Sequence, residues 1–244
     1  MIKKFIKTVF ETAGLDIRRL RPVVAEPPIP HPFVHFGIDV VFDIGANKGQ
    51  CALELRRSGC LVKIISFEPL PHPHRDLVEN AKSDPQWVIH ERVALGASKG
   101  SSVINISGNS LSSSLLPMLQ SHSSAAPESV YIGAADVDII TLDSVFEVYA
   151  EGCLRPSLKI DAQGFEHQVL EGATNSLNRI ACILIELSTV PLYENQKTYD
   201  RFTNYFNSCG YQLWWLKPGF SDPKTGQTLQ FDACFVNCDR VDDH

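Results

Sequence analysis

Four acidic residues stand at or next to the end of an apolar run, a position from which a carboxylate can take part in chemistry: Asp43, Glu68, Asp161 and Glu186. Short apolar runs bounded by turn-forming residues predict buried strands. The carboxyl ends of parallel strands meet at one edge of a sheet, and ligands bind outside that edge. We therefore expect the four carboxylates to face one crevice, where they can accept hydrogen bonds from hydroxyl groups or take up a proton.

The segment after Asp43 has the pattern of a ligand-binding turn. It contains Gly45, Asn47 and Gly49, and a helix-forming segment begins near Cys51. Glycine lets the backbone approach a ligand closely, and the N–H groups at a helix start point towards that ligand. The spacing does not meet the dinucleotide fingerprint G-x-G-x-x-G, so an NAD-dependent oxidoreductase is the less favoured alternative. The pattern D-x-G-x-N-x-G instead resembles the first motif of class I methyltransferases, which use S-adenosylmethionine (SAM).

Glu68 strengthens the interpretation of this turn as a ligand site. It ends the next apolar run, about twenty residues beyond the glycine turn, where folds of this type place the acid that binds a ribose. A carboxylate suits that role because it accepts hydrogen bonds from both ribose hydroxyls.

The elements that must position these residues alternate between strands and helices. The predicted strands are 40–44, 61–67, 87–96 (with its exit), 157–161 and 180–187, followed by two closing strands at 211–217 and 232–237. Helical segments are predicted after the glycine turn, over 71–82, after 141, after 166 and over 199–208. This alternation predicts an α/β domain with a doubly wound sheet. We place the domain at 33–244.

Six motifs, in this order and spacing, resemble the FkbM family of SAM-dependent methyltransferases: VFDIGANKGQ, FEP, VALG, ITLD, LKIDAQGFE and VLEGA. The resemblance runs from about Val40 to at least Tyr193. It implies a Rossmann-like, seven-stranded class I methyltransferase sheet with helices on both faces. It also implies SAM as cofactor and methyl transfer to a hydroxyl group of a sugar, a glycan or a glycosylated natural product. A SAM-binding or adaptor module without catalysis is the alternative.

The resemblance also assigns the residues that contact the cofactor. Asp43 is expected to orient the amino-acid end of SAM, directly or through water, and Glu68 to hold the ribose. The remaining expected contacts are the cradle formed by Gly45, Asn47 and Gly49, and the adenine neighbours Val93 and Ala94.

Asp161 and Glu186 are the candidate catalytic residues. One of them removes the proton of the acceptor hydroxyl or orients it, or both hold Mg²⁺, which lowers the pKa of a bound hydroxyl. A third interpretation gives Glu186 a structural role only. The expected acceptor contacts are Gln163, Glu166 and Ser113. Ser113 lies in a serine-rich segment, 107–129, whose length and polarity predict an acceptor-side loop that closes over the site.

Composition narrows the function classes. The net charge is −6, which disfavours a nucleic-acid partner, because such proteins present basic surfaces. The seven cysteines include no C-x-x-C pair, which argues against a zinc site or a disulfide framework and favours a reducing cytoplasm. Cys182 and Cys234 lie inside apolar runs and are expected to be core thiols. No apolar run approaches the length of a membrane span.

Residues 1–32 precede the motifs and have a different composition. Apolar residues recur at helical spacing from Ile2 to Ala13 among several lysines and arginines, and prolines follow between 22 and 32. We expect an amphipathic helix and a stiff connector. The helix either docks on its own domain or a partner, or makes a peripheral contact with an anionic membrane surface.

Overall fold

The computed structural model describes residues 30–241. The chain divides into two units, 1–30 and His31–His244, and the second holds all the elements described below. The predicted N-terminal helix lies outside the described residues. Within the described part of the chain, no helix is long and apolar enough to cross a membrane.

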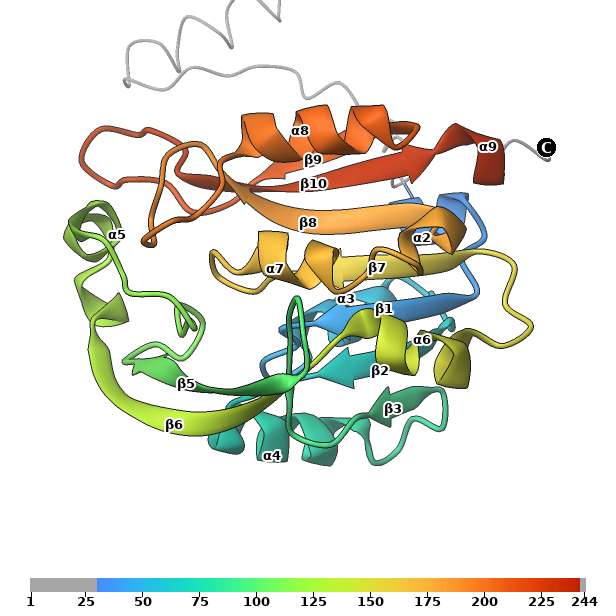
Figure 1. Cartoon of the computed structure of the whole chain (residues 1–244), viewed down its shortest axis with the longest axis horizontal. Coiled ribbons are helices and arrows are strands. Elements are labelled where there is room, and N and C mark those ends of the chain that lie inside the picture. The colour runs from blue at the N-terminus through green and yellow to red at the C-terminus, as the bar shows by residue number, and fades with distance from the viewer. Residues whose placement is uncertain (1–29, 242–244) are drawn as a thin grey trace, which may run out of the picture. The chain divides into compact units, whose positions relative to one another are not determined.

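A seven-stranded sheet forms the centre of the domain, in the order β3-β2-β1-β7-β8-β10-β9 (Figure 1). All neighbouring pairs are parallel except those of β10 with β8 and with β9, which are antiparallel. The strands are β1 Val40–Ile44, β2 Lys63–Phe67, β3 Trp87–Ile89, β7 Pro156–Ile160, β8 Cys182–Ser188, β9 Tyr211–Pro218 and β10 Gln230–Asn237. The predicted Rossmann-like, seven-stranded fold class is confirmed.

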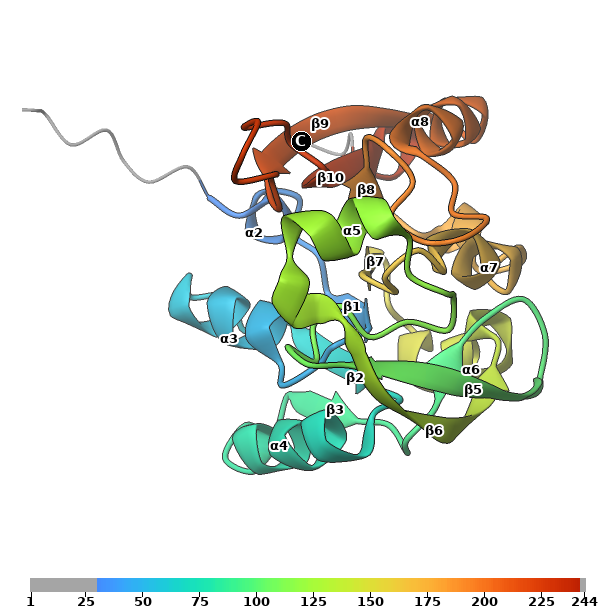
Figure 2. The same ribbon diagram turned by 90° about the vertical axis from the view of Figure 1, so that its left-hand side faces the viewer.

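Helices cover both faces of this sheet (Figure 2). One face packs against α6, α7 and α8, and the other against α2, α3 and α4. These helices are α2 Pro32–His35, α3 Gln50–Arg57, α4 Pro71–Ala81, α6 Leu142–Ala150, α7 Glu166–Glu171 and α8 Tyr199–Ser208. A short α9, Cys238–Val241, follows β10. Because β1 is covered from both sides, all five of its residues are buried, including Asp43.

Alternation along the strands divides the buried side chains into two cores. Phe42 of β1 stacks on Phe146 of α6, with ring centroids 5.2 Å apart, and belongs to the core under α6, α7 and α8. Val41, one residue earlier, belongs to the core under α3 and α4. Cys182 and Cys234 are fully buried in that second core, as predicted. The same alternation places Asp43 on the α3 side of the sheet.

A second, three-stranded sheet differs from the sequence expectation. The expected third strand ends early, and its continuation forms β4 Ala94–Leu95, which pairs with β6 Tyr131–Ile140. β6 also pairs antiparallel with β5 Gly100–Ser107. The sequence alone predicts only two short strands here, 103–106 and 137–140; residues 103–106 lie within β5 and residues 137–140 form the end of β6, so both belong to one long hairpin. Between its strands lie α5 Gln120–Ala125 and the short helix η1 Pro127–Ser129.

Candidate active site

The turn after β1 packs directly against the turn after β7. Gly45 has φ +73°, and a Cβ there would lie 1.9 Å from the carbonyl oxygen of Asp161. Asn47 also has a positive φ, +49°, which asparagine tolerates better than most residues. Only glycine can stand at position 45, because the two strand-end turns touch there.

Glu68 joins the second strand end to this turn. Its Oε2 accepts a 2.7 Å hydrogen bond from the backbone N–H of Asn47, and its Oε1 accepts one of 2.8 Å from that of Leu70. The side chain is almost fully buried, and burial raises the pKa of Glu68 to about 7, although both backbone hydrogen bonds oppose that shift. Each carboxylate oxygen keeps a second lone pair for a ligand donor.

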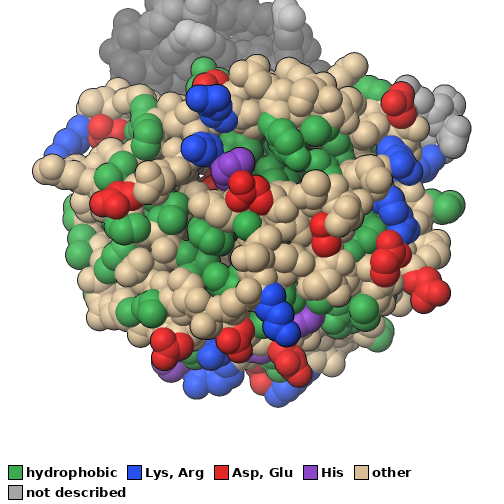
Figure 3. All heavy atoms as spheres, in the orientation of Figure 1, with side chains coloured by type: hydrophobic (Ala, Val, Ile, Leu, Met, Phe, Trp, Pro, Cys, Tyr) green, Lys and Arg blue, Asp and Glu red, His purple; other side chains and the backbone are tan. Residues whose placement is uncertain are grey.

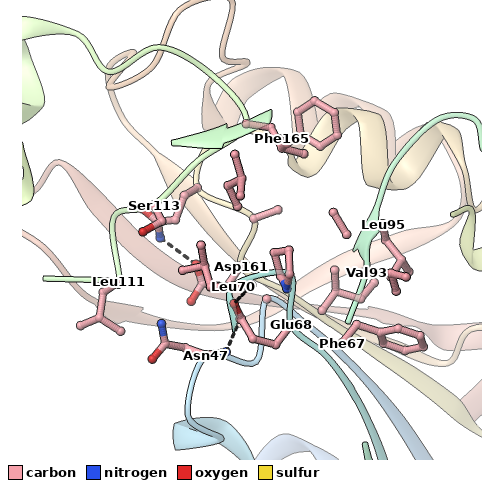
Figure 4. Close-up of a pocket in the computed structure, with 18 of the residues that line it drawn as sticks. Asn47, Phe67, Glu68, Leu70, Val93, Leu95, Leu111, Ser113, Asp161 and Phe165 are labelled. Atoms are coloured by element: carbon pink, nitrogen blue, oxygen red, sulfur yellow. Dashed lines mark hydrogen bonds between the residues drawn. The ribbon is translucent and has the colours of Figure 1, made fainter. Parts of the chain in front are cut away.

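One cavity, which we call the motif cavity, collects most of the residues predicted to bind SAM (Figure 4). Its walls include the predicted residues Gly45, Asn47, Glu68, Val93, Ala94, Asp161, Gln163 and Ser113. Apolar side chains complete it, among them Leu70, Leu95, Ile104, Leu115 and Phe165. Such a cavity, apolar with a few convergent polar groups, has the composition of a small-molecule site.

Lys159 contacts two residues that line the motif cavity, Gly45 and Asp161, and the buried Asp43. Its Nζ lies 3.3 Å from Asp43 Oδ1 and 3.6 Å from Asp161 Oδ2, and it donates a 3.0 Å hydrogen bond to the carbonyl oxygen of Gly45. The two carboxylates raise the pKa of Lys159 and outweigh the opposite effect of burial. Asp43 also accepts a 3.0 Å hydrogen bond from Ser66 Oγ. Asp43 is fully buried and does not line the motif cavity, so its contact with the Gly45 turn runs through Lys159, and its role towards SAM stays a prediction.

The Gln163 amide links the two candidate catalytic acids. Its Nε2 donates 2.7 Å hydrogen bonds to both Asp161 Oδ1 and Glu186 Oε2, so those two oxygens lie no farther apart than twice that distance. Gln230 Nε2 donates a second hydrogen bond to the same Glu186 oxygen. The Tyr193 hydroxyl lies 2.8 Å from Gln163 Oε1, which fixes the orientation of the amide. This network holds Gln163 at φ +50°, a strained value for a residue other than glycine.

Glu186 faces a second cavity, of about 270 Å³, on the α3 side of the sheet. The second cavity shares Gly45, Asn47, Leu111 and Asp161 with the motif cavity. Burial, followed by the charges of Asp161 and Glu166, raises the pKa of Glu186 well above its usual range. Asp161 is thus the carboxylate that both cavities share, with Glu186 beside it.

Two predicted residues have structural roles instead. Gly49 lines neither cavity; it begins α3 with φ +90°, and a Cβ there would lie 2.4 Å from the ring of Trp87. Glu166 Oε1 accepts hydrogen bonds from the backbone N–H groups of Ala162 and Gly164 and so closes the turn that carries Asp161. Glu166 lines neither cavity, and its contact with an acceptor stays a prediction.

The serine-rich segment is tied to the site at several points. Ser114 Oγ donates a 2.6 Å hydrogen bond to the carbonyl oxygen of Gln163. The Tyr193 hydroxyl lies 3.1 Å from the carbonyl oxygen of Ser112. Ser112, Ser113 and Ser114 are all buried. The segment therefore forms a wall of the motif cavity, and its closure in response to an acceptor stays a prediction.

The Mg²⁺ alternative finds no support in this geometry. Over residues 30–241, no three His, Cys, Asp or Glu side chains are grouped so as to hold a metal ion. The facing oxygens of Asp161 and Glu186 already accept the two N–H bonds of Gln163, so a cation between them would have to displace a donor.

The order of the strands, with the antiparallel β10 inserted between β8 and β9, and the motif cavity at their carboxyl ends define a class I methyltransferase-type domain. Residues 43–213 match the family model described as the methyltransferase FkbM domain. The chain belongs to this family, which confirms the resemblance seen in the sequence.

One curated relative is a hexuronic acid methyltransferase, AglP of Haloferax volcanii. It is 28% identical to this chain over 152 residues, which cover 61% of this chain and 56% of that protein. The chain thus matches little more than half the length of that relative.

Solved structures show weaker likenesses. A Streptococcus pneumoniae candidate tRNA (m1A22) methyltransferase in complex with SAM superposes with a TM-score of 0.44 at 10% identity, covering 81% of this chain and 65% of the other. A Streptococcus thermophilus rRNA methylase gives 0.44 at 12% identity, covering 88% and 99%.

Proposed function

We propose that this chain is a SAM-dependent O-methyltransferase that acts on a hydroxyl group of a sugar, a glycan or a glycosylated natural product. One observation carries the proposal: the Asp161 carboxylate lines both the motif cavity and the second cavity. A methyl donor in the first cavity and a hydroxyl in the second would then meet at Asp161. The family and the hexuronic acid methyltransferase relative support the same class of reaction.

The residues of the motif cavity fit SAM. Glu68 presents a buried carboxylate of the kind that holds a ribose, and Val93 and Ala94 offer apolar contacts suited to an adenine. Gly45 leaves the backbone bare where the methionine part would pass. When bound, SAM supplies a methyl group already activated on a sulfonium.

The two acids divide the remaining work between them. Asp161 accepts a hydrogen bond from Gln163 and lies beside the Lys159 ammonium, so its position is fixed and suits it to orient the acceptor hydroxyl. The raised pKa of Glu186 makes it the stronger proton acceptor of this pair when it is ionised. We therefore assign Asp161 to orient the hydroxyl and Glu186 to receive its proton.

Methyl transfer from labelled SAM to a panel of glycosides tests the proposal, together with calorimetry for SAM and NAD. Wild-type protein should bind SAM and not NAD. Asp161→Asn should keep SAM affinity but lose on the order of 10²-fold in turnover, because the group that orients the acceptor hydroxyl is lost. Asp138→Asn, at an exposed position of β6, is the matched control and should retain full turnover. Binding of NAD instead of SAM, or full turnover in Asp161→Asn, would contradict the proposal.

A further inference from the structure

Side chains from three adjacent strands, β8, β10 and β9, form one wall of the second cavity. Glu186 of β8 lies directly opposite Asp232 of β10, and Asp232 lies opposite Lys217 of β9. Residues opposite each other in an antiparallel ladder point to the same face, so all three line the cavity on the α3 side. Trp215, two residues before Lys217, shares that face and also lines the cavity.

The aromatic residue and the carboxylates form a combination suited to a sugar. The apolar C–H face of a sugar ring packs against an aromatic ring, while its hydroxyl groups donate to carboxylates. Trp215 is half-buried and packs against the core under α3 and α4. Its neighbour Trp214 lines neither cavity and is 58% exposed, with its ring stacked on His35 at 5.7 Å. The two tryptophans therefore give a matched comparison.

The charges of the cavity wall decide which sugars fit. Lys217 Nζ lies 3.6 Å from Glu54 Oε1, and Lys159 lies between Asp43 and Asp161, so each lysine already faces an acid. Glu186 and Asp232 form an acid pair on adjacent strands, and Asp232 also lies opposite Lys217. Acidic residues outnumber lysines in the lining of the second cavity, four (Glu54, Asp161, Glu186 and Asp232) to two (Lys159 and Lys217), so a carboxylate on the ligand would add negative charge to an acidic wall.

Resting on the proposed function, we infer that the second cavity is the acceptor site and that it takes a sugar without a carboxylate. The ring packs on Trp215, and hydroxyl or amino groups donate to Glu186 and Asp232. The acceptor hydroxyl then reaches Asp161 at the junction with the motif cavity. This chain would differ in its acceptor from the relative that is named for hexuronic acid, since a uronate is disfavoured by the acid pair.

Saturation-transfer NMR on the full chain, saturated with S-adenosylhomocysteine, can test this inference. The probes are the methyl glycosides of glucose, glucosamine and glucuronic acid, which share one ring and differ in charge. We expect the glucoside and the glucosaminide to bind at least tenfold more tightly than the glucuronide. Asp232→Asn, which removes one of the paired charges, should narrow the difference between glucoside and glucuronide.

The tryptophan variants locate the sugar. Trp215→Ala should weaken glucoside binding at least tenfold, whereas Trp214→Ala should change it less than twofold. Both variants should bind S-adenosylhomocysteine as the wild type does, which also shows that they are folded. Equal or tighter binding of the glucuronide, an unchanged affinity in Trp215→Ala, or no binding of any of the three glycosides would overturn the inference. Failure of wild-type protein to bind S-adenosylhomocysteine would instead contradict the proposed function.

Discussion

The protonation state of Glu68 should control the affinity for SAM near neutral pH. The carboxylate accepts hydrogen bonds from ribose hydroxyls, whereas the protonated acid loses part of that capacity. Burial raises the pKa of Glu68 to about 7, so in the free protein the carboxylate form dominates only above neutral pH. Binding of a ribose favours the carboxylate, lowers that pKa and releases a proton.

The size of the effect follows from this pKa. With a value of about 7, roughly nine-tenths of Glu68 is ionised at pH 8 and roughly one-tenth at pH 6. If only the ionised form binds, affinity should fall by about tenfold between pH 8 and pH 6, which is about 1.4 kcal/mol. The stability of the free protein should change in the opposite direction. Because the folded pKa lies above the unfolded one, the contribution of Glu68 to stability is present at acidic pH and is lost as pH rises through 7.

Calorimetry with 5′-methylthioadenosine isolates this effect, because that ligand keeps the ribose and lacks the titrating amino-acid end of SAM. Wild-type protein should show this change of about tenfold, and its binding enthalpy at pH 7 should depend on the buffer as protons are released. Glu68→Gln should bind weakly at both pH values. Its amide must face one of the two N–H donors of Asn47 and Leu70, so its folding needs a thermal melt as a check. Glu91→Gln, at an exposed position, is the control and should behave as the wild type. Equal affinities at pH 6 and pH 8 in the wild type would refute the reasoning.

Four further experiments test the structure. Gly45→Ala should destabilise the fold by at least about 3 kcal/mol in chemical denaturation, because its Cβ would meet a carbonyl oxygen at 1.9 Å, whereas Gly133→Ala, with open space around it, should be nearly neutral. Lys159→Met should cost about 3–5 kcal/mol by leaving Asp43 buried without its cation, and a stability unchanged in that variant would mean that the pair is dispensable. Deletion of residues 1–30 should leave SAM affinity unchanged, since the sequence motifs begin only after them; a truncated protein that folds but does not bind SAM would mean that the domain boundary is wrong. Hydrogen exchange over 107–129 should slow only when an acceptor is added to the complex with S-adenosylhomocysteine, and uniform fast exchange with unchanged turnover after shortening would make the segment passive.

The part of the fold that the sequence predicted depends on local signals. Each parallel strand is a short run of mostly apolar residues, and after β1, β2 and β7 the run stops at an acid or a turn and a helix follows closely. Those signals placed Glu68 and Asp161 at the same edge of the sheet without knowledge of the pairing, because carboxyl ends of parallel strands share one edge. The surface also carries charges of both signs. On the face shown in Figure 3, lysines and arginines lie beside acidic residues rather than in a broad basic patch.

The second sheet was beyond the reach of those signals. β5, Gly100–Ser107, alternates weakly and is half polar, and its partner β6 carries a glycine and several exposed residues. Their pairing joins residues far apart in the chain, so it depends on a register that no local pattern states. The surroundings of Gly49 and Glu166 were beyond prediction for a related reason. A motif shows that a residue type is required, but not whether a ligand, an indole ring or the backbone of its own turn requires it.

Lys159 shows that a signal can be present and still be missed. It lies within the motif LKIDAQGFE, two residues before Asp161, in a strand whose other residues are all buried. A lysine inside a buried strand needs an anionic partner, because a buried unpaired ammonium is too costly. Period-two alternation puts Lys159 and Asp161 on one face of β7, and the parallel register puts Lys159 opposite Asp43. Asp43 therefore neutralises Lys159 from the neighbouring strand. Lys159 also binds the Gly45 carbonyl, so the Lys159–Asp43 pair holds that carbonyl in place. Asp43, the first acid of the motif, thus supports the glycine turn through Lys159, whereas Glu68 and Asp161 line the motif cavity themselves.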